Sequence, residues 1–335
     1  MRSKNIYILI SSLLIFLSYL YLSDDGVRVS FWNKKNIEST VFSGLNNIKN
    51  ISWDLYISPQ FDYDIYGSLI NSTDKKLYVY MYTFTYDKII DLFKMLWDKW
   101  VDIKMILENN QYQQFWSSFD KIKKKLEVNS IQIKSDKWMW TNYNHAKTLI
   151  MDDKFIIQTA NFTYSSFYKN REMYFVSQDK YIKENLEKIF IKDWNWSKIL
   201  KSDIDDNLLI CNIDCRDKIE YFIKLSNKSI YIHTQYLSDK RVIDLLKSKK
   251  DLDIKIIVWD NQDERLLNDF NWKYKVIKKF YNHNKSILID DKYLIMWSMN
   301  LSENSLDKNR EIWVLLIDIS LISQYKKMFE NDWND

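Results

Sequence analysis

The chain has 335 residues, 46% of them apolar, which is enough for two ordinary domains with a substantial core. Its formal net charge of +4 permits an anionic substrate, but without a basic tail it gives no indication of nucleic-acid binding. The two cysteines, Cys211 and Cys215, form no zinc pattern because no second pair or nearby histidine completes a site. This favours two ordinary thiols, and leaves a local disulfide open if the chain is exported.

An uncharged apolar segment lies at the N-terminus, residues 6–22, between Arg2 and Lys4 on one side and two aspartates on the other. Its 17 residues reach the lower limit for crossing a bilayer. The positive charges before it place the N-terminus inside and the rest of the chain outside. We therefore expect a membrane anchor over 1–25 and a polar tether over 26–51. A signal peptide that is cleaved, giving a secreted protein, is the alternative, and a buried core helix is the third possibility.

An α/β pattern begins near residue 52 and runs through two similar halves. The first half predicts strands at 55–58, 77–84 and 101–107, and helices at 62–73, 87–98, 112–126 and 180–194. The second predicts strands at 208–211, 229–234 and 253–258, and helices at 216–225, 239–247 and the C-terminus. Both halves end on Asp-Trp, at Trp194 and Trp333. This indicates an internal duplication with a boundary near 197–205, giving domains over 52–200 and 201–335.

One stretch occurs in both halves, at residues 144–172 and 282–311. Each copy contains Asn-His-x-Lys, four residues, Asp-Asp-Lys, a further Asn, and a closing Asn-Arg-Glu. The Asp-Asp pair stands between two apolar runs, so each copy predicts a β-hairpin. Residues i and i+2 of a strand face the same side, so His145 points with Lys147, and His283 with Lys285.

An imidazole beside a fixed ammonium suits an anionic centre such as a phosphodiester. Of two histidines, a neutral one can attack phosphorus to form a phosphohistidine, while a protonated one supplies the proton to the leaving alcohol. Glu172 and Glu311 recur at matching positions and can orient the two rings. Asn161 and Asn300 follow the hairpins near helix starts, where donors can hold oxyanions. Lysine and asparagine donors can then stabilise the transition state without a metal.

Three further polar residues receive structural interpretations. We expect Asp152 and Asp290 to hold the hairpin turns behind the site rather than to contact substrate. His233 has no lysine partner two residues away, so we expect a core histidine.

The doubled pattern resembles the phospholipase D superfamily, whose signature is a pair of HxKxxxxD motifs followed by G-S-x-N, and the match covers roughly residues 52–335. The resemblance implies two similar α/β/α domains with pseudo-twofold symmetry, here preceded by the hydrophobic helix, with both motifs in one cleft. It also implies phosphodiester cleavage or transfer through a phosphohistidine without metal or other cofactor. In the family's commoner order His145 is the nucleophile and His283 the acid. The implied catalytic residues are His145, Lys147, Asn161, Glu172, His283, Lys285, Ser298, Asn300 and Glu311, supported by Asp152, Thr159 and Asp290.

The second copy departs from this signature by carrying Trp297 where the family has glycine. The backbone must approach phosphate closely there, so we expect a tryptophan ring to obstruct the cleft. The chain holds 14 tryptophans and 3 glycines. Trp100 stands where a helix usually ends on glycine. We hypothesise that many tryptophans, with Trp194 and Trp333 as exceptions, are glycines encoded by a reassigned UGA codon; genuine tryptophans are the alternative. Other candidates are Trp138, Trp140 and Trp272.

Three functions remain open from the sequence. The first is a membrane-tethered, extracytoplasmic phosphodiesterase or phosphatidyltransferase acting on phospholipid. The second is an exported or tethered non-specific endonuclease of the same chemistry. The third is a catalytically inactive binding module, if Trp297 fills the site. A duplicated chain can supply both half-sites itself, so the site requires no oligomer.

Overall fold

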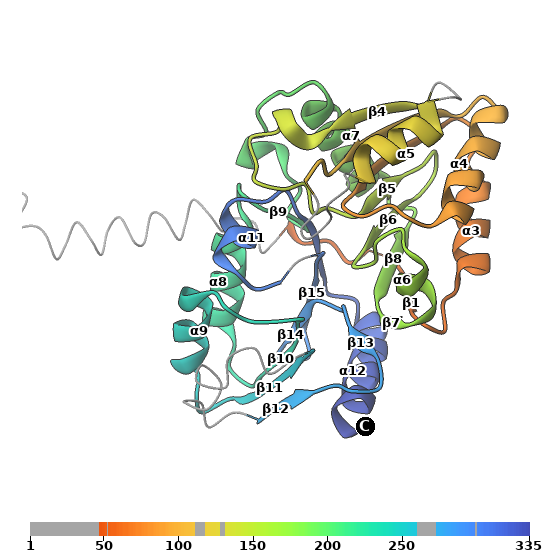
Figure 1. Ribbon diagram of the computed structural model, residues 1–335. Coiled ribbons are helices and arrows are strands. Elements are labelled where there is room, and N and C mark those ends of the chain that lie inside the picture. The colour runs from red at the N-terminus through yellow and green to blue at the C-terminus, as the bar shows by residue number, and fades with distance from the viewer. Residues whose placement is uncertain (1–46, 52, 111–117, 128–130, 260–272, 299) are drawn as a thin grey trace, which may run out of the picture. The chain divides into compact units, whose positions relative to one another are not determined.

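The computed structural model describes residues 47–51, 53–110, 118–127, 131–259, 273–298 and 300–335 (Figure 1). Met1–Ile48 and Lys49–Asp335 form two separate units, and the α/β fold belongs to the second. The predicted anchor at 6–22 lies outside the described residues. Among the helices that are described, none is long and apolar enough to cross a membrane.

The first half of the fold is a seven-stranded mixed sheet with helices on both faces. A short 3₁₀ turn, Asp136–Trp138, follows β4. The elements are β1 (Asp54–Ile57), α3 (Tyr63–Asn71), β2 (Lys76–Met81), α4 (Asp87–Asp98), β3 (Asp102–Leu107), α5 (Ser118–Glu127), β4 (Gln132–Ser135), β5 (Thr148–Ile150), β6 (Phe155–Gln158), α6 (Tyr164–Tyr168), β7 (Asn170–Arg171), β8 (Met173–Ser177) and α7 (Lys180–Trp194).

The second half repeats this order after a 3₁₀ turn at Lys201–Asp203. Its elements are β9 (Leu208–Ile210), α8 (Cys215–Leu225), β10 (Ser229–His233), α9 (Lys240–Lys247), β11 (Asp253–Val258), β12 (Lys273–Val276), β13 (Tyr281–Asn282), β14 (Ser286–Ile289), β15 (Tyr293–Met296), α11 (Glu303–Asp307), β16 (Ile312–Leu316) and α12 (Ile319–Asn334).

The two sheets have the same topology. The first has the order β1-β8-β6-β5-β2-β3-β4, and the second, read from its other edge, β9-β16-β15-β14-β10-β11-β12. The expected hairpins are confirmed, since β5 pairs antiparallel with β6 and β14 with β15. Two similar α/β halves are therefore present.

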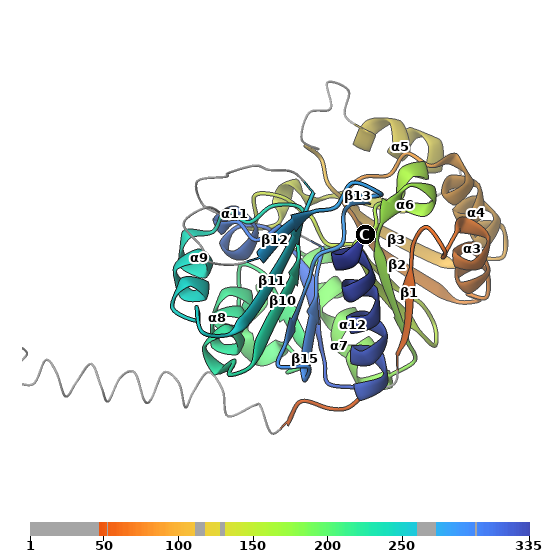
Figure 2. The same ribbon diagram turned by 90° about the horizontal axis from the view of Figure 1, so that it is seen from below.

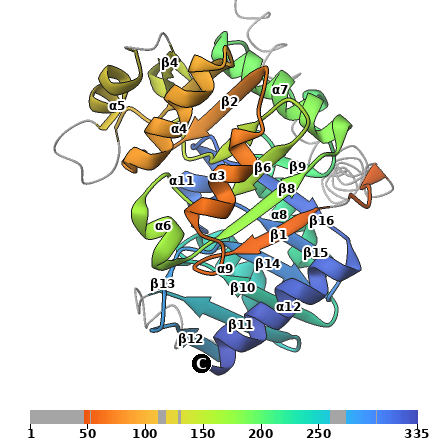
Figure 3. The ribbon, with the colours of Figure 1, turned by 90° about the vertical axis from the view of Figure 1, so that its right-hand side faces the viewer.

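Two helices, α7 and α12, lie between the sheets and bury residues from both halves in one shared core (Figure 2). A second core lies on the other face of the first sheet, under α3, α4 and α5. The helix α12 runs alongside β1 of the first half (Figure 3), and Gln324 donates to the carbonyl of Leu55 there. The C-terminal helix of the second half thus braces the edge of the first.

The observed elements follow the predicted ones with shifts at their ends. The strand expected over 77–84 ends at Met81, and Phe84 makes an isolated bridge to Phe162. The helix expected over 112–126 is Ser118–Glu127 in its described part. Before the first strand, Ile51 is already buried, at 4% exposure.

Two helices end in a left-handed residue, and in both cases that residue is tryptophan. Trp100 follows α4 with a φ of 68°, and Trp196 follows α7 with a φ of 54°. At each end two successive backbone N–H groups donate back to the last turn, which is the Schellman arrangement. These bonds run from Trp100 to Trp97 (2.8 Å), Val101 to Leu96 (3.2 Å), Trp196 to Asp193 (3.1 Å) and Ser197 to Lys192 (2.8 Å).

Candidate active site

The predicted His-x-Lys pairs lie immediately before the first strands of the two hairpins, β5 and β14. Lys147 Nζ donates to the carbonyl of His145 at 2.8 Å, and Lys285 Nζ donates to the carbonyl of His283 at 2.7 Å. Both lysines are fully buried although they carry an ammonium group. A buried ammonium is costly unless something compensates it, so these positions indicate a built anion site rather than surface charge.

Each histidine is bound by the glutamate of the other half. His145 Nδ1 lies 3.0 Å and 3.1 Å from the two oxygens of Glu311, and His283 Nδ1 lies 2.8 Å from Glu172 Oε2. Both carboxylates are fully buried. A neutral imidazole that donates its Nδ1 hydrogen carries its lone pair on Nε2. This exchange of glutamates brings the two motif copies together and leaves Nε2 of each ring unbound by glutamate, with Lys147 Nζ 3.3 Å from Nε2 of His145.

A hydroxyl from the same half supports each glutamate. Thr159 Oγ1 donates to Glu172 at 2.6 Å, and Ser298 Oγ donates to Glu311. Thr159 and Ser298 therefore hold equivalent places, although we expected a supporting role for the first and a catalytic one for the second. Asn170 adds a bond to Glu172 at 2.9 Å. These hydrogen bonds hold both carboxylates in the positions from which they bind the histidine rings.

The two motif asparagines stand between the hairpins and the helices α6 and α11. Asn161 Oδ1 accepts from the backbone N–H of Thr83 at 3.2 Å, and Asn300 Nδ2 donates to Gln235 at 3.3 Å. The amide group of Asn161 and its counterpart are therefore tied to β2 and β10 through the residues that follow those strands.

Burial is the first cause that shifts the titration of the cationic groups. It lowers the pKa of Lys285 to about 7 and that of Lys147 to about 8, against attraction from both glutamates. Burial also lowers the pKa of His283 to about 4, although Glu172 raises it, and lowers the pKa of His145. His283 in turn holds the pKa of Glu172 below its usual value despite burial. Before an anion binds, both rings are therefore neutral at pH 7 and the lysines are close to losing their charge.

The hairpin aspartates lie at the other end of each hairpin from the histidines. Asp152 accepts the backbone N–H groups of residues 74–76 at 2.7–2.9 Å. Asp290 accepts those of residues 227–229 in the same way. They join the turn to the start of β2 or β10, a contact with backbone rather than with the site.

The two halves also exchange an arginine–aspartate pair, which was not predicted from the sequence. Arg171, beside Glu172, binds Asp332 of α12 at 2.7 Å, while Arg310, beside Glu311, binds Asp193 of α7 at 2.9 Å. Each aspartate precedes a closing tryptophan. His233 is fully buried, with Nε2 3.4 Å from Asp332, while Tyr80 donates to Asp193 at 2.8 Å in the equivalent place. The repeated Arg and Asp were visible in the sequence, but nothing local showed that they pair across the halves.

The aromatic surroundings of the histidines were also not predicted. Tyr82 meets the ring of His145 edge-on at 4.5 Å between centroids. Tyr281 stacks on His283 at 6.0 Å. These rings limit the orientations open to each imidazole.

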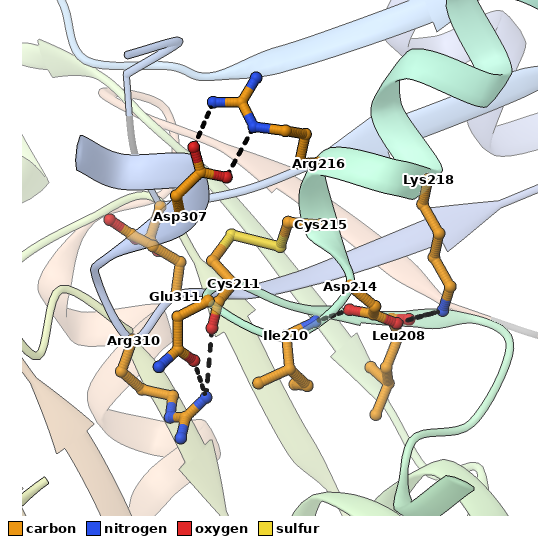
Figure 4. The surroundings of a disulfide bond; sticks show 12 residues. Leu208, Ile210, Cys211, Asp214, Cys215, Arg216, Lys218, Asp307, Arg310 and Glu311 are labelled. Carbon is orange, nitrogen blue, oxygen red and sulfur yellow. Dashed lines mark hydrogen bonds and ion pairs between the residues drawn. A yellow bond between two sulfur atoms is a disulfide. The ribbon is translucent and has the colours of Figure 1, made fainter. Parts of the chain in front are cut away.

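The interpretation of Cys211 and Cys215 as separate thiols is wrong, because the structure joins them by a disulfide (Figure 4). Both are fully buried, at the corner between β9 and α8. The carbonyl of Cys211 accepts a hydrogen bond from Arg310 at 3.2 Å, and the N–H of Cys211 donates to the backbone carbonyl of Glu311 at 3.1 Å. Ser58 makes the same two contacts with Arg171 and Glu172 in the first half. The disulfide thus fixes a corner that holds the backbone of Glu311, the glutamate bound to His145.

Trp297 takes a different position from the one expected. Its ring is fully buried and stacks on Trp313 of β16, with centroids 4.7 Å apart, so its described contact lies in the core. Both indole N–H groups are buried without a hydrogen-bond partner, which is uncommon for tryptophan. Within the described residues, no group of three or more His, Cys, Asp or Glu side chains could hold a metal ion.

Known proteins provide three comparisons. The family model described as "Cardiolipin synthase, PLD-like domain" matches residues 66–194 and 219–333, more than half of the chain. No curated protein matches the sequence. The fold resembles phosphatidylserine synthase from Haemophilus influenzae Rd KW20 at 14% identity and a TM-score of 0.66, covering 88% of this chain and 90% of that one.

The fold also resembles polyphosphate kinase from Porphyromonas gingivalis, at 14% identity and a TM-score of 0.68 over 85% of this chain. The chain spans about half of that kinase, 51% of its length. At these identities the likeness concerns the fold. The doubled His-Lys-Asn pattern, the matching halves and the family model lead to one conclusion: the chain belongs to the phospholipase D superfamily.

Proposed function

We propose that the protein is a membrane-tethered, extracytoplasmic phosphodiesterase or phosphatidyltransferase that acts on phospholipid through a phosphohistidine. The crossed pairs His145–Glu311 and His283–Glu172 carry the proposal, because they join two half-sites into one. The description of the matching family model, cardiolipin synthase, and the printed name of one structural neighbour, phosphatidylserine synthase, favour a phospholipid substrate.

In the first step, Nε2 of neutral His145 attacks phosphorus. A P–N bond forms while the bond from phosphorus to the leaving oxygen breaks. His283, protonated on Nε2, gives that proton to the leaving alkoxide and becomes neutral. His283 then takes a proton from water or from an acceptor alcohol, whose oxygen attacks phosphorus as the P–N bond breaks. The cycle restores both rings.

The lysines supply the electrostatic part of this reaction. A bound phosphodiester places a negative charge beside Lys147 and Lys285, which favours their ammonium forms and raises their pKa values again. Because the site is buried, charge developing on the phosphoryl oxygens is stabilised more strongly than it would be in water. The same anion favours the protonated form of His283 that the first step requires.

The extracytoplasmic location rests on two observations. A disulfide persists in oxidising compartments and is rare in the cytosol of mesophiles. The uncharged segment at residues 6–22, with Arg2 and Lys4 before it, has the charge pattern of an anchor with the N-terminus inside. Both observations support a catalytic part on the outer side of the membrane.

The test uses the purified full-length protein in detergent, with phospholipid vesicles labelled with ³²P in the headgroup phosphate and, separately, labelled DNA. We expect products from lipid, label on the protein after an acid-free quench, and neither with His145→Ala. Thermal melting of the variant controls for its folding. Cleavage of DNA alone identifies the nuclease alternative. Unchanged turnover in His145→Ala removes the mechanism, and inactivity on both substrates favours a binding module.

A further inference from the structure

A pair of buried acids lies beside the His145 half of the site and takes no part in the mechanism above. Glu108 follows β3 and Asp136 follows β4, and they are 1% and 4% exposed. Carboxyl groups are seldom buried without a cation or a metal. Their position therefore calls for an explanation.

The two side chains meet at one backbone N–H group. The N–H of Asn144 lies 2.7 Å from Glu108 Oε2 and 3.0 Å from Asp136 Oδ2. The other oxygens accept from Asn110 (2.6 Å) and Asn109 (2.9 Å). Two ionised carboxylates sharing a donor in a buried place would repel each other. Burial, a hydrogen bond donated by the Glu108 carboxyl to Asp136 and the charge of Asp136 raise the pKa of Glu108 to about 9.

The neighbouring charged groups do not neutralise the pair. Those on the surrounding segments are each bound elsewhere or exposed: Asp102 and Lys104 pair with one another, Lys134 donates to the carbonyl of Trp194, Lys137 is exposed, His145 binds Glu311, and Lys147 donates to the carbonyl of His145. Among the described residues, no cation therefore balances two negative charges at this pair.

The second half lacks this arrangement. The register of β2 with β3 and of β10 with β11 places Trp259 at the counterpart of Glu108. In the same way, the register of β3 with β4 and of β11 with β12 places Ile277 at the counterpart of Asp136. The pair is therefore not a requirement of the fold, and it distinguishes the two otherwise similar half-sites.

We propose that Glu108 and Asp136 are positioning residues that share one proton and hold the backbone immediately before His145. The N–H of Asn144 binds the acid pair, and its side chain donates to the carbonyl of Ile106 at 3.0 Å. The next N–H, of His145, donates to the backbone carbonyl of Arg310 in the other half at 2.9 Å. Loss of the shared proton would leave two charged carboxylates repelling each other around the Asn144 N–H, which would displace the backbone that carries the ring. The effect on turnover rests on the proposed function, while the shared proton and the ring position do not.

Two activity-independent measurements test the proposal on the full-length protein. A group whose pKa is raised on folding contributes stability that is complete below its unfolded pKa and is lost as pH rises through the folded value. The contribution of Glu108 to the unfolding free energy should fall between about pH 4.5 and 9. Glu108→Gln keeps a donor to Asp136 but has no proton to lose, so the unfolding free energy of the wild type minus that of the variant should fall over this range. The same slope in both proteins overturns the shared proton.

The second measurement follows the three histidine rings by NMR, with His145→Ala for assignment. Glu108→Ala should shift the His145 signals and leave those of the other two histidines unchanged, and Glu108→Gln should leave all three in place. Asp102→Asn on β3 controls for loss of a carboxylate nearby. Unmoved His145 signals in Glu108→Ala overturn the positioning role. With bis(4-nitrophenyl) phosphate as probe, Glu108→Ala should lower kcat at least tenfold with little change in KM; wild-type kcat contradicts the kinetic role.

A second inference rests on Trp100 and Trp196. For a residue with a β-carbon the left-handed conformation costs roughly 1–2 kcal/mol, and glycine is the usual residue at this place in a helix end. The other non-glycine residues with positive φ in the described part are asparagine or aspartate, which tolerate it. Trp100 is 90% exposed and gains little burial in return.

We infer that the native polypeptide carries glycine at positions 100 and 196, from UGA codons read as glycine. Trp194 differs, because it is 8% exposed and stacks on Phe190, as Trp333 stacks on Phe329. The tryptic peptide 193–198 of the protein from its own cells contains both Trp194 and Trp196. Its fragment masses should show tryptophan at 194 and glycine at 196, and peptide 100–104 should begin with glycine. Tryptophan at 100 or 196 overturns the inference for that position.

Discussion

Replacing Trp100 by glycine should stabilise the recombinant protein rather than destabilise it. A β-carbon at a φ of 68° costs roughly 1–2 kcal/mol, which glycine avoids. Glycine loses roughly 0.5–1 kcal/mol in additional backbone entropy on folding. Since the indole is 90% exposed, little burial is given up. The difference leaves a net gain of about 0–1.5 kcal/mol in unfolding free energy.

Trp196 should show a smaller gain because its ring has a partner. Lys134 Nζ lies 4.7 Å from the ring centroid, and a cation–π contact at an exposed site contributes roughly 0.5–1 kcal/mol. The assay is equilibrium urea unfolding of wild type, Trp100→Gly and Trp196→Gly at pH 7. Lys99→Gly is the matched control, one residue earlier with a φ of −87°, where glycine should be neutral or destabilising.

A buried tryptophan gives the opposite sign. Trp53 is 7% exposed and meets Phe155 at 5.0 Å, so Trp53→Gly should cost about 3–5 kcal/mol or more. If Trp100→Gly loses stability as Lys99→Gly does, the left-handed backbone is not the controlling factor and the reasoning fails.

Three other predictions concern the site and its corner. Glu172→Gln should lower the pKa of His283 measured by NMR titration and leave the pKa of His145 unchanged. The reason is that the carboxylate that raises the pKa of His283 belongs to the first half. With the lysine pKa values lowered to about 7 and 8, kcat/KM should fall as pH rises above that range, as Lys285 and then Lys147 lose their charge. Replacing both cysteines by serine should lower the unfolding free energy by about 2 kcal/mol, the value for so short a closed loop.

Each of these has a contrary outcome. A shift of the His145 titration in Glu172→Gln would mean that the glutamates are not exchanged. A profile that stays level to the ordinary lysine pKa would mean that the ammonium groups are not depressed by burial. If reductant leaves the unfolding of the wild type unchanged, the disulfide does not secure the corner between β9 and α8.

The local pattern of the sequence was sufficient for the strands, the hairpins and the duplication. Short apolar runs on either side of the Asp-Asp turns define β5–β6 and β14–β15, because a short apolar run and a turn's chemistry are local properties. The same pattern placed His145 with Lys147, since residues two apart share a face of a strand. The residues around Trp100 also predicted that a helix ends there.

Partners that lie far apart in the sequence were decided by tertiary structure. Glu311 is matched to His145, and Arg171 to Asp332, across more than 100 residues, and no periodicity specifies how two similar halves dock. The acid pair beside Asn144 depends on the register of β3 with β4.

The sequence by itself determined which side chains this protein has for phosphoryl chemistry and that they come in two sets. Tertiary structure determined that each set completes the other, because burying α7 and α12 between the two sheets brings the glutamate of each half against the histidine of the other. Hydrophobic burial is non-directional, so the sequence pattern could predict which residues form the core. It could not predict the glutamate–histidine pairs that form when the two halves pack together.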